Sequence, residues 1–409
     1  MTDPLAALRP GDRVLVASGA GEPAPLVERL LARRHEIPDV ELLLGYNLAG
    51  TVRPELVDPP RVTVFGGYGA NRALLAAGAA RVLPAHQSTL PGLIESGELG
   101  VDVVFLQCSP VGADGNHSLG VTADVALPAV ARARAVVAEI NDRMPRTYGD
   151  TTLSASMITH AVHTSRPLAE LPPSTPSALE RRVAERVAEL VPDRAVLQFG
   201  IGRVPEAVAA LLRDHRDLGV HSGMLGDWLV DLVEAGAVTN AAKPIDAGVT
   251  VGGVLLGTRR LYDWADENAA LSVRGSRYTH GAATLARLDT LVTVNGAIEV
   301  DLTGQVNAEL IGDRYVGAVG GQVDYVRGGS TAPHGRSILA FTAMAGRHSR
   351  IVARLASGVV TTPRSDVDTV VTEHGVAHLR GRNLDERARL LAGIADPAMR
   401  EDLLRAAAR

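Results

Sequence analysis

One carboxylate is notable because apolar residues surround it where the sequence predicts a strand to end. Residues 292–309 read Val-Thr-Val-Asn-Gly-Ala-Ile-Glu-Val-Asp-Leu-Thr-Gly-Gln-Val-Asn-Ala-Glu. On a strand, Glu299 and Asp301 share one face, and the apolar residues between and beside them share the other. A carboxylate among apolar neighbours is partly desolvated, which makes it either a structural liability or a reactive group. From spacing alone, a solvent-facing glutamate on an edge strand is the more common interpretation, so both readings stay open.

Two glycine-rich segments could bring backbone N–H groups close to a ligand. Residues 317–329 hold five glycines, which let a backbone approach an anion or oxyanion closely. The segment Gly-Ile-Gly-Arg-Val-Pro at 200–205 follows an apolar run, and N–H groups at such a helix start attract phosphate or carbonyl oxygen. It lacks the third glycine of a dinucleotide fingerprint, so it is a weak nicotinamide signal. The structural alternatives are a long surface loop for the first segment and a tight α/β turn for the second.

Two further segments hold residues that could bind a metal or an anion. His374 and His378 are four residues apart, as in a zinc-binding helix. However, the His-Glu-x-x-His order is missing and Gly375 disfavours a helix, so no metal site is predicted. Gly375 could instead offer its N–H group in a tight turn. Arg146 could pair with phosphate or carboxylate, although an arginine on a loop is ordinarily only solvated.

The elements that must position these residues occur twice along the chain. Asp12 and Asp193 each open an apolar run that ends in Gly-x-Gly, with the glycines seven and nine residues after the aspartate. Each copy predicts a short buried strand, a turn and an amphipathic helix that opens near a proline. A chance match of a common motif is the alternative. The shared offsets favour two related α/β halves.

A proline-rich stretch separates the two halves. Four prolines within eleven residues predict a linker, and Ser177 with Glu180 forms a capping box that opens the next helix. We therefore predict an N-terminal α/β domain over 1–165, a linker over 166–177 and a C-terminal α/β domain over 178–409. Apolar runs in both halves are continuous rather than alternating, which suits strands covered on both faces of a parallel sheet.

Composition excludes several classes of protein. The 409 residues are 46% apolar, enough for two or three domains, and the net charge of −5 gives no basic footprint for nucleic acid. The single cysteine, Cys108, excludes a disulfide framework and a cysteine-rich metal site. The N-terminus does not read as an export signal, and no apolar run is long enough to span a membrane. We expect a cytoplasmic enzyme that binds neither nucleic acid nor membrane.

Taken together, these segments resemble the acetyl-CoA hydrolase/transferase family, of the 4-hydroxybutyrate and acetate CoA-transferase type. The resemblance covers most of the chain and is densest from Asn295 to the C-terminus. Each piece alone is modest, but their combination is highly specific. The matching text lies at residues 141–149, 200–205, 295–307, 320–328, 349–352, 361–368, 371–381 and 386–388.

The resemblance implies two similar open, mostly parallel-sheet α/β domains of the CoA-transferase type. It makes Glu299 the catalytic nucleophile, and it makes Gly375 a backbone donor to the oxyanion. Residues of the first glycine turn are implied as further donors: Gly200, Ile201, Gly202, Arg203 and Val204. Residues of the second glycine-rich segment are implied to line the CoA thioester as a loop: Gly320, Gly321, Gln322 and Gly328.

The implied reaction transfers CoA between an acyl-CoA and a small carboxylic acid such as acetate or 4-hydroxybutyrate. Glu299 attacks the acyl carbonyl to give a mixed anhydride, and CoA thiolate then converts the anhydride into an enzyme–CoA thioester. CoA is thus a substrate rather than a permanent cofactor, and the family suggests a homodimer. Plain acyl-CoA hydrolysis would use the same residues. A CoA-binding protein without activity is the third hypothesis.

Three sites depart from the family text. Gly223 stands where a glutamate is common, Gly296 where a serine is usual, and Gly317-Ala318 where Ser-Gly is usual. None of these changes removes Glu299. We therefore expect the chemistry to be kept and the acid specificity to differ.

Overall fold

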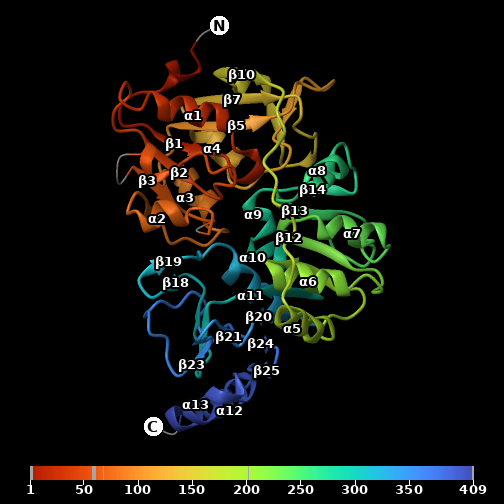
Figure 1. Ribbon diagram of the computed structural model, residues 1–409. Helices are drawn as coiled ribbons and strands as arrows, with labels where there is room; N and C mark the ends of the chain where they lie inside the picture. The colour runs from red at the N-terminus through yellow and green to blue at the C-terminus, as the bar shows by residue number, and fades with distance from the viewer. Residues whose placement is uncertain (1–2, 58–60, 68, 201, 408–409) are drawn as a thin grey trace. The chain divides into compact units, whose positions relative to one another are not determined.

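The computed structural model describes residues 3–57, 61–67, 69–200 and 202–407. The chain divides into two compact units, which Figure 1 colours by residue number. Unit 1 comprises Met1–Pro172, Met224–Asp227 and Val251–Thr279, and unit 2 comprises Pro173–Gly223, Trp228–Thr250 and His280–Arg409. The main division falls inside the predicted linker, where residues 165–177 form neither helix nor strand. The two short segments that return to unit 1 were not part of the predicted boundaries.

Unit 1 is built on a seven-stranded parallel sheet with the order β10-β7-β5-β1-β2-β3-β4. The first strand lies in the middle, so the chain winds outward from it to both sides. The sheet strands are β1 (Arg13–Val16), β2 (Glu41–Leu44), β3 (Val62–Val64), β4 (Arg81–Val82), β5 (Val103–Cys108), β7 (Ala135–Asn141) and β10 (His160–Thr164).

Helices and short strand pairs complete unit 1. The helices are α1 (Ala24–Ala32), α2 (Arg72–Ala76), α3 (Leu90–Ser96), α4 (Ala126–Arg132), α8 (Arg259–Ala265) and α9 (Ser276–Thr279), with 3-10 turns η1 (Pro4–Ala7), η2 (Gly19–Gly21), η3 (Pro54–Leu56) and η4 (Ala155–Met157). The remaining strands are β6 (Asn116–Ser118) paired with β9 (Thr152–Ser154), β8 (Tyr148–Gly149) paired with β14 (Leu271–Val273), and β13 (Thr250–Leu255).

Unit 2 repeats this winding around its own first strand. Its strand order is β25-β24-β20-β15-β11-β12, in which β25 alone is antiparallel to its neighbour. The strands are β11 (Val196–Phe199), β12 (Gly219–Leu225), β15 (Leu291–Asn295), β20 (Arg336–Ala340), β24 (Thr369–Thr372) and β25 (Gly375–His378). Both units therefore place the first strand between strands that follow it on either side, which agrees with the predicted repeat.

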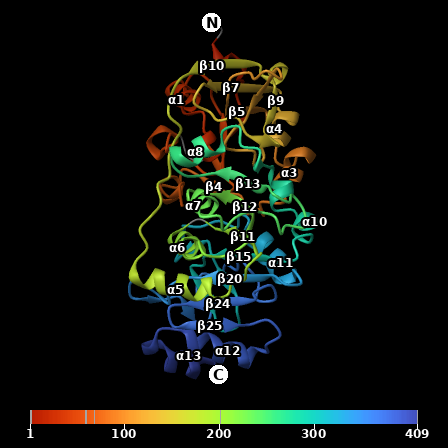
Figure 2. The same ribbon diagram turned by 90° about the vertical axis from the view of Figure 1, so that its right-hand side faces the viewer.

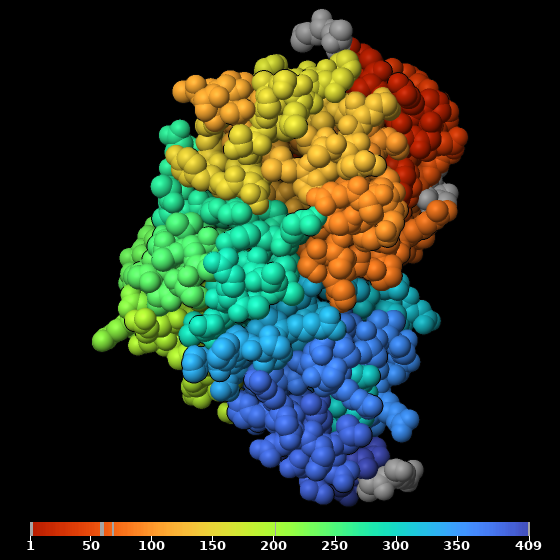
Figure 3. Space-filling view, turned by 180° about the vertical axis from the view of Figure 1, so that it is seen from behind, coloured from red at the N-terminus to blue at the C-terminus, as the bar shows by residue number. Residues whose placement is uncertain are grey.

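Helices flank the sheet of unit 2 on both faces: Figure 2 shows α5 and α6 on one side and α10 and α11 on the other, with α12 and α13 beside β25. These helices, with α7, are α5 (Ala178–Ala188), α6 (Arg203–Leu211), α7 (Trp228–Glu234), α10 (Ala282–Leu285), α11 (Gln322–Thr331), α12 (Leu384–Ile394) and α13 (Arg400–Ala407), with the 3-10 turn η5 (Pro397–Met399). The predicted capping box at Ser177 and Glu180 is present in full. The C-terminal helices form part of the surface seen in Figure 3. Leu384 and Leu404 of these helices are about half exposed.

Three small sheets decorate unit 2, and one of them carries Glu299. It joins β16 (Glu299–Asp301) to β17 (Val306–Asn307) and β23 (Ile351–Val352). The other two are hairpins, β18 (Leu310–Ile311) with β19 (Arg314–Tyr315) and β21 (Met344–Ala345) with β22 (His348–Ser349). One apolar core cluster includes Val300, Ile351, Leu339 and Val370, so it joins the small sheet of Glu299 to the main sheet. Burial of these side chains fixes the strand that bears the carboxylate.

The strands confirm the prediction of parallel sheets covered on both faces. All residues of β5, β7 and β15 are buried. The prediction of a loop at residues 320–328 is wrong, because α11 begins at Gln322. The helix contains glycines because neighbouring side chains leave no room for a Cβ atom. A Cβ atom at Gly328 would lie 3.1 Å from Leu285 and 3.2 Å from Leu291.

Candidate functional site

Three segments with predicted site residues lie at one edge of the unit 2 sheet, because each follows the carboxyl end of a parallel strand. The turn at Gly200 follows β11, and the segment leading to Glu299 follows β15. These two strands are neighbours. The strand that follows β11 in the chain, β12, lies on one side of it, and the later strand β15 lies on the other. A reversal of this kind opens a crevice outside the strand ends, where ligands of open α/β sheets bind.

Close packing holds the two strand ends together at this point. The N–H of Gly200 donates to the carbonyl of Val294 at 2.9 Å. A Cβ atom at Gly200 would lie 3.1 Å from the Oδ1 atom of Asn295, so the glycine allows the close approach. The amides of Gln198 and Asn295 also bond reciprocally, at 2.9 and 3.2 Å. The turn and the segment that leads to Glu299 are thus joined where they leave the sheet.

Glu299 combines partial burial with a carboxylate that has no partner among the described residues. The residue is half-buried, and none of the described residues forms an ion pair or hydrogen bond with its carboxylate. Its backbone is held from both sides: Ile298 N–H donates to Asn307 at 2.8 Å, and Val300 N–H donates to Arg350 at 2.8 Å. The side chain is therefore presented on a fixed strand with its oxygens available.

The carboxylate of Asp301, unlike that of Glu299 on the same strand face, is engaged in local hydrogen bonds. Its Oδ1 atom accepts hydrogen bonds from Thr303 N–H at 2.9 Å, from the Thr303 hydroxyl at 2.7 Å and from Gln305 N–H at 3.0 Å. This carboxylate caps the turn that follows β16. Of the two acidic residues of β16, Glu299 is the one whose carboxylate stays available for chemistry.

Open space lies next to three glycines near this strand. No atom lies within 4 Å of the place that a Cβ atom would occupy at Gly202, Gly296 or Gly320. Helix α6 begins at Arg203, so the N–H groups of Gly202, Arg203 and Val204 belong to a first helical turn, which leaves such groups without intrahelical partners. Predicted residue Ile201 lies outside the described residues. The side chain of Arg203 is 3.7 Å from Glu180.

The start of α11 contacts the segment that leads to Glu299. The Nε2 atom of Gln322 donates to the carbonyl of Gly296, and its Oε1 atom accepts from the Thr362 hydroxyl at 3.1 Å. Gly320 and Gly321 precede this residue and are half-buried. Gln322 therefore contacts the segment that leads to Glu299, and Gly320 and Gly321 lie next to it in the chain. Gly328 is buried within the helix, where packing accounts for it.

Gly375 lies in the tight turn that the sequence predicts. It pairs with Thr372 across the β24–β25 hairpin, so that Glu373 and His374 form the two-residue loop. Glu373 is buried, and its Oε2 atom accepts from Ala343 N–H at 2.8 Å. The neighbouring His374 lies 3.7 Å from Glu373 and 3.9 Å from Asp396. Because β24 is parallel to β20 and β20 to β15, this turn lies at the same sheet edge as Gly200.

The departure at Gly223 is accompanied by a buried imidazole. A Cβ atom at Gly223 would lie 2.6 Å from the ring of His280, and one at Gly321 would lie 2.4 Å from the same ring. The ring stacks at a tilt on Tyr325, with 4.7 Å between centroids. Burial, with His221 nearby, lowers the pKa of His280 to about 3, so the ring is neutral at pH 7. A glutamate at position 223 would collide with this ring.

Other candidate residues of the sequence have structural tasks. The Arg146 guanidinium donates to the Ser109 hydroxyl and to the carbonyls of Pro110 and Asn116, each at 3.2 Å, so it holds a loop of unit 1. His378 lies on a strand rather than on a helix. Within the described ranges, no group of three or more His, Cys, Asp or Glu side chains could hold a metal ion.

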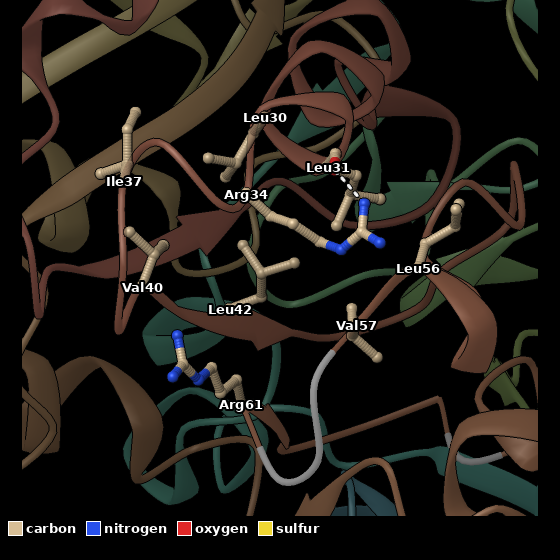
Figure 4. A pocket seen from close by; sticks show the side chains of 9 residues that line it. All are labelled: Leu30, Leu31, Arg34, Ile37, Val40, Leu42, Leu56, Val57 and Arg61. Carbon is tan, nitrogen blue, oxygen red and sulfur yellow. Dashed lines mark hydrogen bonds between the residues drawn. The ribbon is translucent and has the colours of Figure 1, made fainter.

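A pocket occurs in unit 1, and it contains none of the predicted site residues. Figure 4 shows its apolar lining with two arginines at the rim. Arg34 donates to the Leu31 carbonyl at 3.0 Å, and Arg61 pairs with Asp39 at 2.7 Å. Since both cations already have protein partners, this pocket has no charge set aside for a ligand. No described helix has both the length and the apolar character needed to cross a membrane.

Fold and site together define an α/β protein of two doubly wound units in which a carboxylate is presented at a topological switch point. Family comparison assigns this class. The acetyl-CoA hydrolase/transferase N-terminal domain matches residues 4–169, and the C-terminal domain of the same family matches residues 257–407. The chain belongs to the acetyl-CoA hydrolase/transferase family, which confirms the predicted family and enzyme class.

Individual relatives agree with this assignment. The chain is 37% identical to the 4-hydroxybutyrate coenzyme A transferase of Clostridium kluyveri over 397 residues, which cover 96% of this chain and 92% of that protein. The crystal structure of RipA from Yersinia pestis matches with a TM-score of 0.91 at 31% identity, over 99% of this chain and 95% of that one. The 4-hydroxybutyrate CoA-transferase structure from Porphyromonas gingivalis gives a TM-score of 0.80 at 30% identity, over 98% and 94%. The predicted fold class is confirmed.

Acetyl-CoA hydrolases are more distant. The enzyme of Kluyveromyces lactis is 27% identical over 232 residues, which cover 53% of this chain and 43% of that protein.

Proposed function

We propose that this protein is a CoA-transferase that moves CoA between an acyl-CoA and a small carboxylic acid, with Glu299 as the nucleophile. The observation that carries the proposal is the half-buried carboxylate of Glu299, which has no partner among the described residues and lies at the switch point of the unit 2 sheet. A carboxylate is a poor nucleophile in water and a better one when it is desolvated and aimed. CoA is a substrate in this reaction.

The reaction proceeds through two acyl transfers in each direction. A carboxylate oxygen of Glu299 attacks the thioester carbonyl, the C–S bond breaks, and CoA thiolate leaves a mixed anhydride on the enzyme. The thiolate then attacks the glutamyl carbonyl, which releases the first acid and leaves a glutamyl-CoA thioester. A second carboxylate attacks this thioester and reverses both steps. Each attack produces a tetrahedral oxyanion that needs donors about 3 Å away.

Backbone N–H groups are the proposed donors. Gly202, Arg203 and Val204 offer the first turn of α6, and open space lies beside Gly202. Gly375 completes the set of proposed donors. The N–H of Gly200, which the sequence also predicts as a donor, is already bonded to the Val294 carbonyl, and Ile201 lies outside the described residues. Gly320, Gly321 and Gln322 are proposed to line the thioester, because Gln322 contacts the carbonyl of Gly296 near the nucleophile. Remote contacts with the long CoA arm would supply binding energy to the transition state.

Relatives with 30–37% identity over nearly the full chain are named CoA-transferases, and the hydrolases match only about half of it. This difference favours transfer over hydrolysis as the main reaction. Hydrolysis uses the same residues, with water in place of the second acid. We also propose that the protein works as a homodimer in the cytoplasm, as its family resemblance implies.

Covalent trapping tests this function directly. The protein is incubated with acetyl-CoA, then treated with borohydride or hydroxylamine and digested for mass analysis. We expect modification at Glu299 alone, and none in Glu299→Ala. Undiminished turnover in Glu299→Ala, or modification of another residue, would overturn the assignment. Single-turnover assays with and without acetate separate transfer from hydrolysis, because a transferase holds its thioester until an acid arrives.

A further inference from the structure

One arginine contacts the nucleophile's strand on both sides of Glu299. The Nε atom of Arg350 donates to the carbonyl of Ile298 at 3.1 Å, and its Nη2 atom donates to the carbonyl of Ala297. Through its backbone, the same residue accepts a hydrogen bond from Val300 N–H at 2.8 Å. Residues immediately before and after Glu299 are thus held by one side chain and its own main chain.

The arginine is in turn held in a single orientation. Its guanidinium carbon lies 4.8 Å from the centre of the Phe341 ring, and its Nη1 atom donates to the Thr342 hydroxyl at 3.4 Å. Burial lowers the pKa of Arg350 to about 10, which leaves it charged at neutral pH, with the carboxylates of Glu373 and Glu180 nearby. A planar fork that binds two adjacent carbonyls is a task that lysine cannot copy.

The same arginine connects the nucleophile to the turn that carries Gly375. Arg350 N–H donates to the carbonyl of Ala343 at 2.8 Å. Ala343 N–H donates to the Oε2 atom of buried Glu373 at 2.8 Å. Since Glu373 lies two residues before Gly375 in the hairpin loop, a short chain of hydrogen bonds runs from the Glu299 strand to the proposed oxyanion donor.

We propose that Arg350 is a positioning residue that holds the Glu299 strand and, through Ala343 and Glu373, sets its place relative to the Gly375 turn. This inference rests on the proposed function. The nucleophile and an oxyanion donor must both meet one carbonyl group, so their mutual geometry controls the reaction. A misplacement of about 1 Å can cost roughly 10²-fold in rate. Glu299 itself sits on a strand of only three residues, so the bonds from Arg350 add to the few that its strand pairing provides.

The test compares Arg350→Lys with Arg347→Lys. Arg347 is exposed on the neighbouring hairpin turn and serves as the matched control. In single-turnover reactions with acetyl-CoA, we expect Arg350→Lys to form the Glu299–CoA thioester about 10²-fold more slowly, while KM for acetyl-CoA stays within twofold. Arg347→Lys should react at the wild-type rate.

Chemical rescue distinguishes positioning from simple loss of structure. Arg350→Ala should lose most thioester formation and recover part of it when guanidinium ion is added, whereas the control should not respond. Wild-type rates in Arg350→Lys would overturn the inference, and so would a loss of CoA binding in Arg350→Ala that guanidinium does not reverse. If the wild-type protein itself forms no adduct at Glu299, the proposed function fails first, and that result is independent of any Arg350 variant.

Discussion

The two units carry the same Gly-x-Gly turn after their first strand, but only the second glycine differs: it is open in unit 2 and packed in unit 1. The first glycine is packed in both units, since a Cβ atom at Gly200 would lie 3.1 Å from Asn295. In unit 1, a Cβ atom at Gly19 would lie 2.8 Å from Leu256, and one at Gly21 would lie 3.1 Å from Thr122. At Gly202 in unit 2, no atom lies within 4 Å of the corresponding place. A repeated strand and turn therefore do not repeat a function: the chemistry depends on whether neighbours fill the space at the turn.

Polar groups show the same contrast. In unit 1, the Gln107 amide donates to the carbonyls of Ala20 and Glu22, at 3.3 and 3.0 Å, and so closes the turn. The Glu22 carboxylate is buried and accepts from Ala49 N–H at 3.2 Å, and burial raises its pKa. In unit 2, Glu299 is half-buried and lacks a described partner. One carboxylate is built into the fold, and the other keeps its oxygens free of bonds to the described residues.

The largest expected effect is on kcat, when one carboxylate from each unit is replaced in turn. Glu299→Ala should lower kcat by at least about 10³-fold, because removal of a covalent nucleophile removes the reaction path. Glu22→Gln should leave kcat at the wild-type level, since Glu22 supports a closed turn. Steady-state assays with acetyl-CoA and a carboxylate acceptor measure both. Equal losses in the two variants would show that the units do not differ as proposed.

Local signals were enough to predict most main strands and both turns. Strands β11 and β13 are continuous runs of mostly apolar residues, the pattern that predicts buried strands of a parallel sheet. The helix over residues 322–331 was missed. Its glycines mimic a loop, and the reason for them is tertiary: Gly329 lies where a Cβ atom would meet the Arg336 carbonyl at 2.8 Å.

The site was harder to predict because its contacts join distant segments. The alternation of polar and apolar residues around Glu299 did not show whether its side chain is exposed or partly buried. Only the family resemblance favoured a reactive group. What buries Val300 is Ile351 on β23, about fifty residues later in the chain, which no local pattern reveals. Arg350 and His280 were not singled out for the same reason. Arg350 was visible only as part of the matching Ser-Arg-Ile-Val text, and the spacing does not say which carbonyls its side chain reaches.

A smaller effect, on the free energy of unfolding, should distinguish the packed turn at Gly19 in unit 1 from the open space at Gly296 in unit 2. Gly19→Ala forces a side chain into a left-handed backbone (φ +65°) against Leu256, and should lower the free energy of unfolding by about 1–3 kcal/mol. Gly296→Ser adds its side chain to open space and should change that free energy by less than about 0.5 kcal/mol. It should instead raise KM for the acid several-fold. Urea unfolding and steady-state kinetics of the two variants test this. A loss of stability in Gly296→Ser would show that the space beside Gly296 is not open.

The smallest effect is a difference in pH dependence between the units. The pKa of His280 in unit 2 is lowered to about 3. In the unfolded state a histidine has a pKa of about 6.5, so the unfolded chain takes up this proton at a higher pH than the folded protein does. The contribution of His280 to stability is complete above the unfolded pKa and is lost as pH drops through the folded pKa. The raised pKa of Glu22 in unit 1 acts oppositely: its contribution is complete below the unfolded pKa and is lost as pH rises through the folded one.

The two tryptophans allow each unit to be followed separately, because Trp264 belongs to unit 1 and Trp228 to unit 2. Urea unfolding of Trp228→Phe and Trp264→Phe proteins at pH 4, 5.5 and 7 should show unit 2 weakening on acidification. Adding His280→Asn should flatten that slope, and adding Glu22→Gln should stabilise unit 1 at pH 7 without doing so at pH 4. An acid slope of unit 2 that survives His280→Asn would assign the proton to another group, with His221 the nearest candidate because it already acts on the pKa of His280.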